Sequence, residues 1–166
     1  FKNYIFKSFN DITVVNLKIS KVNIKKFKDN LSMHYTGINR KADKILSSIS
    51  KTYSLEKRKK LTNDSIKFKK LLINNDFKQI GKIFNDAWLY KKNFGSKKIR
   101  KLLNDHHSMA IKKGMYGGKI LGAGGGGYFL FLANKTAKKR ISKKLNNLEL
   151  INFNFYNKGA EIVYDD

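Results

Sequence analysis

The chain has 166 residues, with 36 Lys+Arg against 12 Asp+Glu, a formal net charge of +24, and neither Cys nor Pro. The lack of cysteine excludes a disulfide framework, a thiolate zinc site and a cysteine nucleophile. A hydrophobic fraction of 41% supports a folded core and excludes a disordered basic tail. The longest apolar stretch, 128–133, is far shorter than the roughly 20 residues of a membrane helix, and we expect a cytoplasmic location.

The N-terminal part of the chain is expected to begin with a hairpin. Residues 1–9 and 12–19 are rich in aromatic and β-branched residues, and Asn10 and Asp11 lie between them. This pattern predicts two paired strands. The first residue is Phe1 rather than Met, which suggests a fragment of a longer polypeptide. We expect residues 1–19 to be end strands of a preceding domain or an interdomain hairpin, and 20–166 to form one domain.

A short helix, a strand and a second helix are expected next. Ser20 is placed to start a basic helix that ends near Asn30, because serine is a favoured N-cap residue. Residues 31–35 predict a strand that Gly37 interrupts. Between 41 and 50 the apolar residues recur at the i, i+3, i+4, i+7 spacing of a one-faced helix.

Three longer helices are predicted: the first over about 54–73, the second opening at Asp76, and the third over 96–113. Asp76 and Gln79 match a variant of the capping box at the start of the second helix, and Gly114 is placed to end the third. The expected inward residues, in order of helix, are Leu61, Ile66, Phe68, Leu71 and Leu72; Phe77, Ile80, Phe84, Ala87 and Trp88; and Ile99, Leu102, Leu103, His106 and Ala110.

The C-terminal part predicts a strand, a loop and a strand over 119–133, then a helix over about 134–147. Residues 151–155 and 162–164 alternate in hydrophobicity around a turn at 157–159, which predicts a final hairpin. The order of elements indicates an α+β fold, in which a helical block is inserted between strands of a largely antiparallel sheet.

The least accidental feature is a glycine-rich loop, because five of the 12 glycines lie between residues 122 and 127. A flexible linker is the simple interpretation, but the predicted strands on both sides argue against it. Consecutive glycines here imply a close approach where no Cβ fits, or a positive φ. Such a loop offers backbone N–H groups to an anion. Neither a Walker loop nor a dinucleotide fingerprint matches, since the spacing is wrong and a strand follows.

The run Lys-Ile-Leu-Gly-Ala-Gly-Gly-Gly-Gly at 119–127 resembles the third conserved motif of the GHMP small-molecule kinases. Three more segments, 35–42, 86–92 and the closing hairpin at 153–164, are similar to the branch that phosphorylates D-glycero-D-manno-heptose 7-phosphate to the 1,7-bisphosphate. The resemblance implies the C-terminal GHMP domain, a ferredoxin-like sandwich. The ATP-cradling Gly-Leu-Gly-Ser-Ser motif and the catalytic acid of the family do not occur in this chain.

The resemblance therefore implies half of an ATP- and Mg²⁺-dependent sugar-phosphate kinase, inactive without an N-terminal half as its partner. A homodimer stays open, and we predict no catalytic residue and no metal ligand in this chain. By this resemblance, the glycine loop would lie beside the nucleotide phosphates, and a second set of residues would hold the sugar phosphate. The simpler interpretations are that Thr36 caps a helix and that the lysines are solvated. These residues are Gly122, Gly124, Gly125, Gly126 and Gly127 for the nucleotide, and Thr36, Arg40, Trp88, Lys91 and Lys92 for the sugar phosphate.

Two alternatives remain open. One is a GHMP kinase with another small-molecule acceptor. The other is a basic module that binds nucleic acid, because lysine and arginine neutralise phosphates. Only four of the 36 basic residues are arginine, however, and arginine is the residue that reads guanine and stacks on bases. Lysine spread over nearly every predicted helix favours a solvated surface, so nucleic acid is an unlikely partner.

Overall fold

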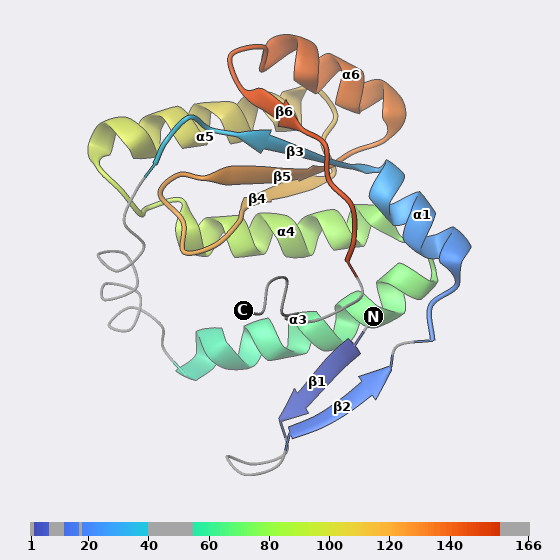
Figure 1. The fold of residues 1–166 in the computed structure, drawn as a ribbon. Coiled ribbons are helices and arrows are strands. Elements are labelled where there is room, and N and C mark those ends of the chain that lie inside the picture. The colour runs from blue at the N-terminus through green and yellow to red at the C-terminus, as the bar shows by residue number, and fades with distance from the viewer. Residues whose placement is uncertain (1, 7–11, 17, 40–54, 157–166) are drawn as a thin grey trace, which may run out of the picture.

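The computed structural model describes residues 2–6, 12–16, 18–39 and 55–156 of the chain. Three predictions lie outside these residues: the helix at 41–50, the sugar-phosphate contact of Arg40, and the turn and return strand of the closing hairpin. The described part forms two antiparallel sheets and five helices with connecting turns (Figure 1).

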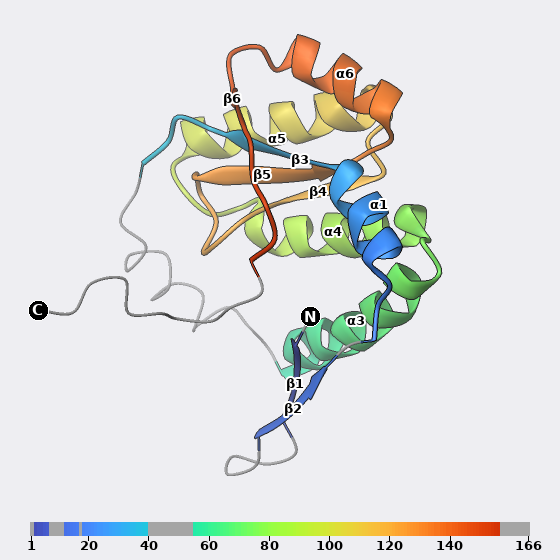
Figure 2. The ribbon, with the colours of Figure 1, turned by 45° about the vertical axis from the view of Figure 1, so that its right-hand side comes forward.

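The smaller sheet is the N-terminal hairpin. Strands β1 (Lys2–Phe6) and β2 (Ile12–Asn16) pair antiparallel, with Lys2 opposite Asn16 and Phe6 opposite Ile12. The predicted pairing is therefore confirmed. In both views this pair lies apart from the main sheet, beside α3 (Leu55–Ile73) (Figures 1 and 2).

The main sheet has four antiparallel strands in the order β4-β5-β3-β6. The strands are β3 (Leu31–Tyr35), β4 (Gly117–Ile120), β5 (Tyr128–Leu132) and β6 (Glu149–Ile151). The first of these in the chain lies between the third and the fourth, which is the strand order of a ferredoxin-like fold. The predicted α+β class, with a helical block between strands, is confirmed.

The last strand is shorter than predicted. Alternation over 151–155 suggested a longer strand, but β6 ends at Ile151. Beyond it, Phe153 and Phe155 pack against an apolar cluster formed by residues of α1 (Lys21–Asp29), α3 and α4 (Phe77–Lys91). Within this cluster Phe155 stacks on Phe27, with ring centroids 6.1 Å apart. Phe153 and Phe155 therefore lie in this cluster and not in the predicted strand.

The helices start where side chains cap them. Helices α1 (Lys21–Asp29), α4 (Phe77–Lys91), α5 (Lys97–Lys112) and α6 (Lys135–Lys144) each have an N-cap side chain that accepts a backbone N–H. These caps are Ser20, Asp76, Ser96 and Asn134. Asp76 caps α4 as predicted, but its own N–H donates to the Leu71 carbonyl, because the positive φ of Asn75 ends α3 there.

The helices cover the main sheet on both faces (Figures 1 and 2). Helices α5 and α6 lie over one face, and α1, α3 and α4 lie toward the other. Alternate residues of β5 face opposite sides of the sheet. Phe129 and Phe131 pack with buried residues of α5 and α6, and Leu130 and Leu132 pack with residues of α1, α3 and α4. Two predicted inward residues were wrong, since Ile66 is 57% and Leu102 39% exposed.

Helix α4 packs closely against the edge strand β4 through two glycines. A Cβ at Gly81 would stand 2.4 Å from the carbonyl carbon of Tyr116, and one at Gly117 would stand 1.8 Å from the Gly81 oxygen. No larger residue fits either position without moving the backbone. This contact fixes the direction of α4, whose C-terminus points to the loop between β4 and β5 (Figure 1).

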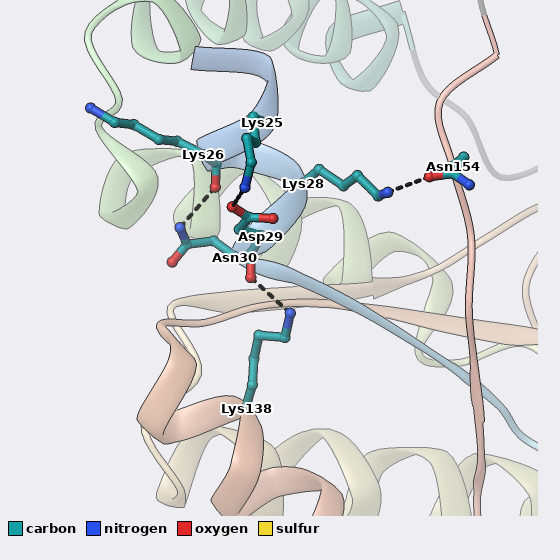
Figure 3. Close-up of polar contacts among 7 residues, drawn as sticks. All are labelled: Lys25, Lys26, Lys28, Asp29, Asn30, Lys138 and Asn154. Carbon is teal, nitrogen blue, oxygen red and sulfur yellow. Dashed lines mark hydrogen bonds and ion pairs between the residues drawn. The ribbon is translucent and has the colours of Figure 1, made fainter. Parts of the chain in front are cut away.

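The far end of the sheet is tied by exposed polar contacts around the end of α1 (Figure 3). Lys138 of α6 donates to the Asp29 carbonyl at 2.7 Å, Lys25 pairs with the Asp29 carboxylate at 2.9 Å, and Lys28 donates to Asn154. These contacts join α1, α6 and the segment after β6.

No helix in the described ranges is long and apolar enough to cross a membrane.

Candidate functional site

The glycine-rich loop between β4 and β5 depends on backbone conformations that favour glycine. The φ angles of Gly122, Gly124, Gly125, Gly126 and Gly127 are +68°, +102°, +69°, +141° and +86°. Residues with a Cβ rarely adopt such angles. The run of glycine is therefore required by the path of the loop, as one of the two sequence interpretations stated.

Three hydrogen bonds join the end of this loop to the segment after β3, and a fourth lies within that segment. The N–H and the hydroxyl of Thr36 both donate to the Gly127 carbonyl, at 2.9 and 2.8 Å. The Gly127 N–H donates to the Ile38 carbonyl at 3.1 Å, and the Ile38 N–H donates to the Thr36 hydroxyl at 3.4 Å. Thr36, 6% exposed, thus positions the loop through its hydroxyl.

Neighbouring groups also approach the loop too closely for larger residues. A Cβ at Gly126 would lie 2.7 Å from Cγ2 and 2.9 Å from the carbonyl oxygen of Ile38. A Cβ at Gly124 would lie 3.0 Å from the Phe94 ring and 3.4 Å from Cβ of Lys91. The second sequence interpretation, a close approach that leaves no room for a Cβ, is therefore also confirmed. Ile38 approaches the loop from one side, and Phe94 and Lys91 approach it from another.

Lys91, the last residue of α4, supports the same loop. Its ammonium group donates to the Gly122 carbonyl, and its aliphatic stem faces Gly124. Lys92 follows as the C-cap of α4 and is half-buried. The helix end therefore brings Lys91 onto the loop backbone, and Lys92 is its neighbour in the chain.

The middle of the loop leaves backbone donors without protein acceptors. Gly124, Gly125 and Gly126 are buried, yet in the described ranges their N–H groups donate to no acceptor. Buried backbone donors are almost always paired in folded proteins. Three adjacent unpaired donors are suited to an anion.

Trp88, one of the residues expected to hold the sugar phosphate, is buried instead of lying at the surface. Its indole is 3% exposed, stacks on His107 at 5.1 Å between centroids, and contacts Phe129 at 5.3 Å. α4 lies at the edge of the sheet, so this face of the helix turns into the core. The structure thus assigns Trp88 to packing, and Arg40 lies outside the described residues.

The neighbouring histidines are structural. His107 contacts the Asn85 side-chain oxygen at 3.1 Å, and that oxygen also accepts the Gly118 N–H at 3.1 Å. Burial lowers the pKa of His107 to about 4, so the ring is neutral near pH 7. Across the part of the chain that the structure describes, no three His, Cys, Asp or Glu residues gather to hold a metal ion.

Two contributors to the site were missed from the sequence. Ile38 clamps Gly127 through its backbone, and Phe94 packs against Gly124 from the turn after α4. Gly95, beside Phe94, has a φ of +98°. A glycine so soon after a predicted helix signals a tight turn, but no pattern in the sequence shows that this turn faces the glycine loop.

Comparison with known proteins gives consistent matches. Residues 68–149 match the family described as GHMP kinases C terminal. A D-glycero-alpha-D-manno-heptose 7-phosphate kinase of Campylobacter jejuni is 29% identical over 135 residues, which cover 78% of this chain and 40% of that protein.

Solved structures share the fold. A Campylobacter jejuni protein assigned as a sugar kinase superposes with a TM-score of 0.60 at 26% identity, over 95% of this chain and 46% of that one. The mevalonate kinase of L. major, in complex with R-mevalonate, gives a TM-score of 0.63 at 17% identity, over 88% of this chain and 44% of that one. The chain thus spans less than half the length of each of these relatives.

Proposed function

Because the chain contains a GHMP kinase C-terminal domain, we propose that it is the C-terminal half of an ATP-dependent sugar-phosphate kinase. The proposed acceptor is D-glycero-D-manno-heptose 7-phosphate, and the product is the 1,7-bisphosphate. The 29% identity to a heptose 7-phosphate kinase supports this acceptor. The proposed N-terminal half supplies the residues that cradle ATP and act on the acceptor hydroxyl.

The observation that carries this proposal is the set of unpaired donors in the glycine loop. Gly124, Gly125 and Gly126 are buried and lack acceptors within the described ranges. Phosphoryl transfer is catalysed mainly by positioning and by stabilising charge on phosphate oxygens. Backbone donors in a rigid loop meet that need without any covalent chemistry.

The remaining residues have supporting roles in this proposal. Lys91 and Thr36 hold the two ends of the loop, through the carbonyls of Gly122 and Gly127. Lys92, which follows Lys91 at the end of α4, contributes positive charge toward the sugar phosphate. Arg40, by its resemblance to the family pattern, has the same role. Mg²⁺ would accompany ATP, and its ligands are proposed to lie in the N-terminal half.

A chimeric enzyme tests the proposal. Residues 1–166 are joined to the N-terminal half of the Campylobacter jejuni heptose 7-phosphate kinase, and transfer from ATP is followed by phosphorus NMR. We expect the chimera to form the bisphosphate and the chain alone to form none. A folded chimera that binds ATP but phosphorylates another acceptor, such as mevalonate or homoserine, would replace the heptose assignment by a different GHMP activity.

A matched pair of glycine variants tests the role of the loop. Gly124 and Gly114 have similar φ angles, +102° and +95°, and a Cβ at either would first meet an atom at 3.0 Å. Alanine should therefore strain both positions by a similar amount, about 1–2 kcal/mol. Only Gly124→Ala should lower kcat/KM of the chimera, by about tenfold or more, because it displaces the donors. Equal kinetic losses in the two variants would contradict the proposed role.

A further inference from the structure

A cavity of about 610 Å³ lies between the main sheet and helices α3 and α4. Its walls are mostly apolar, and five phenylalanine rings contribute to them: Phe27, Phe68, Phe84, Phe153 and Phe155. Its volume lies within the usual range of small-molecule sites. None of the glycine-loop residues 122–127, nor Thr36, Trp88, Lys91 or Lys92, lines it.

One lysine of the sheet reaches into this apolar space. Lys119 of β4 lines the cavity, and its ammonium lies over the Phe84 ring, 4.9 Å from the centroid. Burial lowers the pKa of Lys119. In the described part of the chain, no hydrogen bond or ion pair reaches this ammonium.

An unpaired ammonium in apolar surroundings is costly. A buried charge is normally paired, because the protein interior does not replace the water it loses. The face of Phe84 offers partial compensation through a cation–π contact. The other charged side chains of the cavity are Asp64 and Lys69, and neither forms an ion pair with Lys119. The cavity therefore combines a large apolar surface with a desolvated ammonium, that of Lys119, which lacks a counter-charge in the described part of the chain.

We propose that this cavity binds an amphipathic monoanion, an apolar chain with a terminal carboxylate, and that Lys119 is the counter-charge of the carboxylate. The phenylalanine rings and the aliphatic side chains of Met33, Leu121 and Leu130 contact the apolar chain. A polar sugar phosphate does not suit this cavity, because its many hydroxyl groups would lack partners on such walls. The proposal is independent of kinase activity and adds a second ligand to the domain.

Calorimetric titration of the full chain with three probes tests this proposal. Dodecanoate, dodecan-1-ol and dodecylammonium share one apolar chain and differ in head-group charge, and each is used below its micelle concentration. We expect dodecanoate to bind with one-to-one stoichiometry, at least tenfold tighter than the alcohol, while the ammonium binds weakest. This order follows from charge complementarity to Lys119.

Two variants locate the site. Lys119→Met keeps a similar apolar side chain without the charge, and Lys112→Met removes an exposed lysine from α5 as the matched control. We expect Lys119→Met to weaken dodecanoate at least tenfold, or 1.4 kcal/mol, and to leave dodecan-1-ol unchanged. Lys112→Met should change neither. Circular dichroism of both variants checks that the fold is retained.

Several results would overturn the proposal. The first is no binding of dodecanoate to the full chain, as expected if another segment of the polypeptide fills the cavity. The second is equal affinity of the carboxylate and the alcohol. The third is an unchanged dodecanoate affinity in folded Lys119→Met. None of these results bears on phosphoryl transfer by the chimera, so the two proposals fail separately.

Discussion

The two faces of the main sheet are packed very differently. On the face under α5 and α6, Phe129, Phe131 and Ile120 are fully buried with Ala137 and Ile141. On the other face, Leu130 is only half-buried and lines the 610 Å³ cavity with Met33 and Lys119. Adjacent residues of one strand, Leu130 and Phe131, therefore lie in an open and a closed environment.

This difference separates stability from binding within one small domain. The closed face is filled by fully buried side chains, as protein interiors usually are. The open face leaves space and an unpaired charge, which are features of a ligand site. The glycine loop lies at one end of the same sheet and is held by backbone hydrogen bonds, so its conformation does not depend on the cavity.

The largest expected effect compares the two adjacent residues of β5. Phe131→Ala should lower the free energy of unfolding by about 3–5 kcal/mol, because it leaves a hole in a filled core. Leu130→Ala should cost less than about 2 kcal/mol, because the cavity already leaves one side of Leu130 without contacts. Urea unfolding of the full chain measures both changes. Equal losses would show that the cavity side is packed as tightly as the closed side.

A smaller effect is expected from His34 and His107, two of the three buried histidines. Burial, with lesser contributions from Lys138 and Lys92, lowers the pKa of His34 and of His107 to about 4. Below pH 6.5 the unfolded chain takes up protons at these rings and the folded chain does not. Unfolding free energy should therefore fall as pH falls from 6.5 toward 4, by at most about 1.4 kcal/mol per histidine per pH unit.

The measurement is the urea midpoint between pH 7 and pH 5.5, above the range in which carboxylates titrate. The His34→Leu variant should show a shallower fall over this range, because one of the two rings is removed. An identical slope in this variant would mean that His34 is protonated equally in both states.

The smallest effect concerns α3, at the border of the open face. Ile66 is 57% exposed and Leu72 is 2% exposed. Ile66→Ala should change the unfolding free energy by less than about 0.5 kcal/mol. Leu72→Ala, the matched control on the same helix, should cost about 2–5 kcal/mol. A large loss at Ile66 would place an additional partner over this part of the helix.

The sequence predicted most elements because each has a local cause. Ser20 and Asp76 cap helices within three residues of their own positions, and the 31–35 strand appears with the expected bounds. Periodicity was weaker at deciding which residues face inward. Ile66 and Leu102 fit an apolar helix face but are exposed, since burial depends on what packs against the helix rather than on its own pattern.

For the candidate site, the sequence predicted the glycines and the neighbourhood of Thr36 and Lys91. It did not predict that the Thr36 hydroxyl bonds the Gly127 carbonyl, 91 residues away, or that Trp88 turns inward. Those facts depend on how α4 docks on β4 through Gly81 and Gly117, a contact between segments that are far apart in the chain.

The sequence by itself determined the class of fold, the position of the glycine loop and a resemblance to the GHMP kinases, because caps, periodicity and a short motif are local properties. Only the tertiary structure decided which face of the sheet is closed and which lysine lies in apolar surroundings. Lys119 is one of many lysines in the sequence. Its surroundings become apolar only when α3, α4 and the segment after β6 assemble around it, because desolvation arises from the whole arrangement of neighbours.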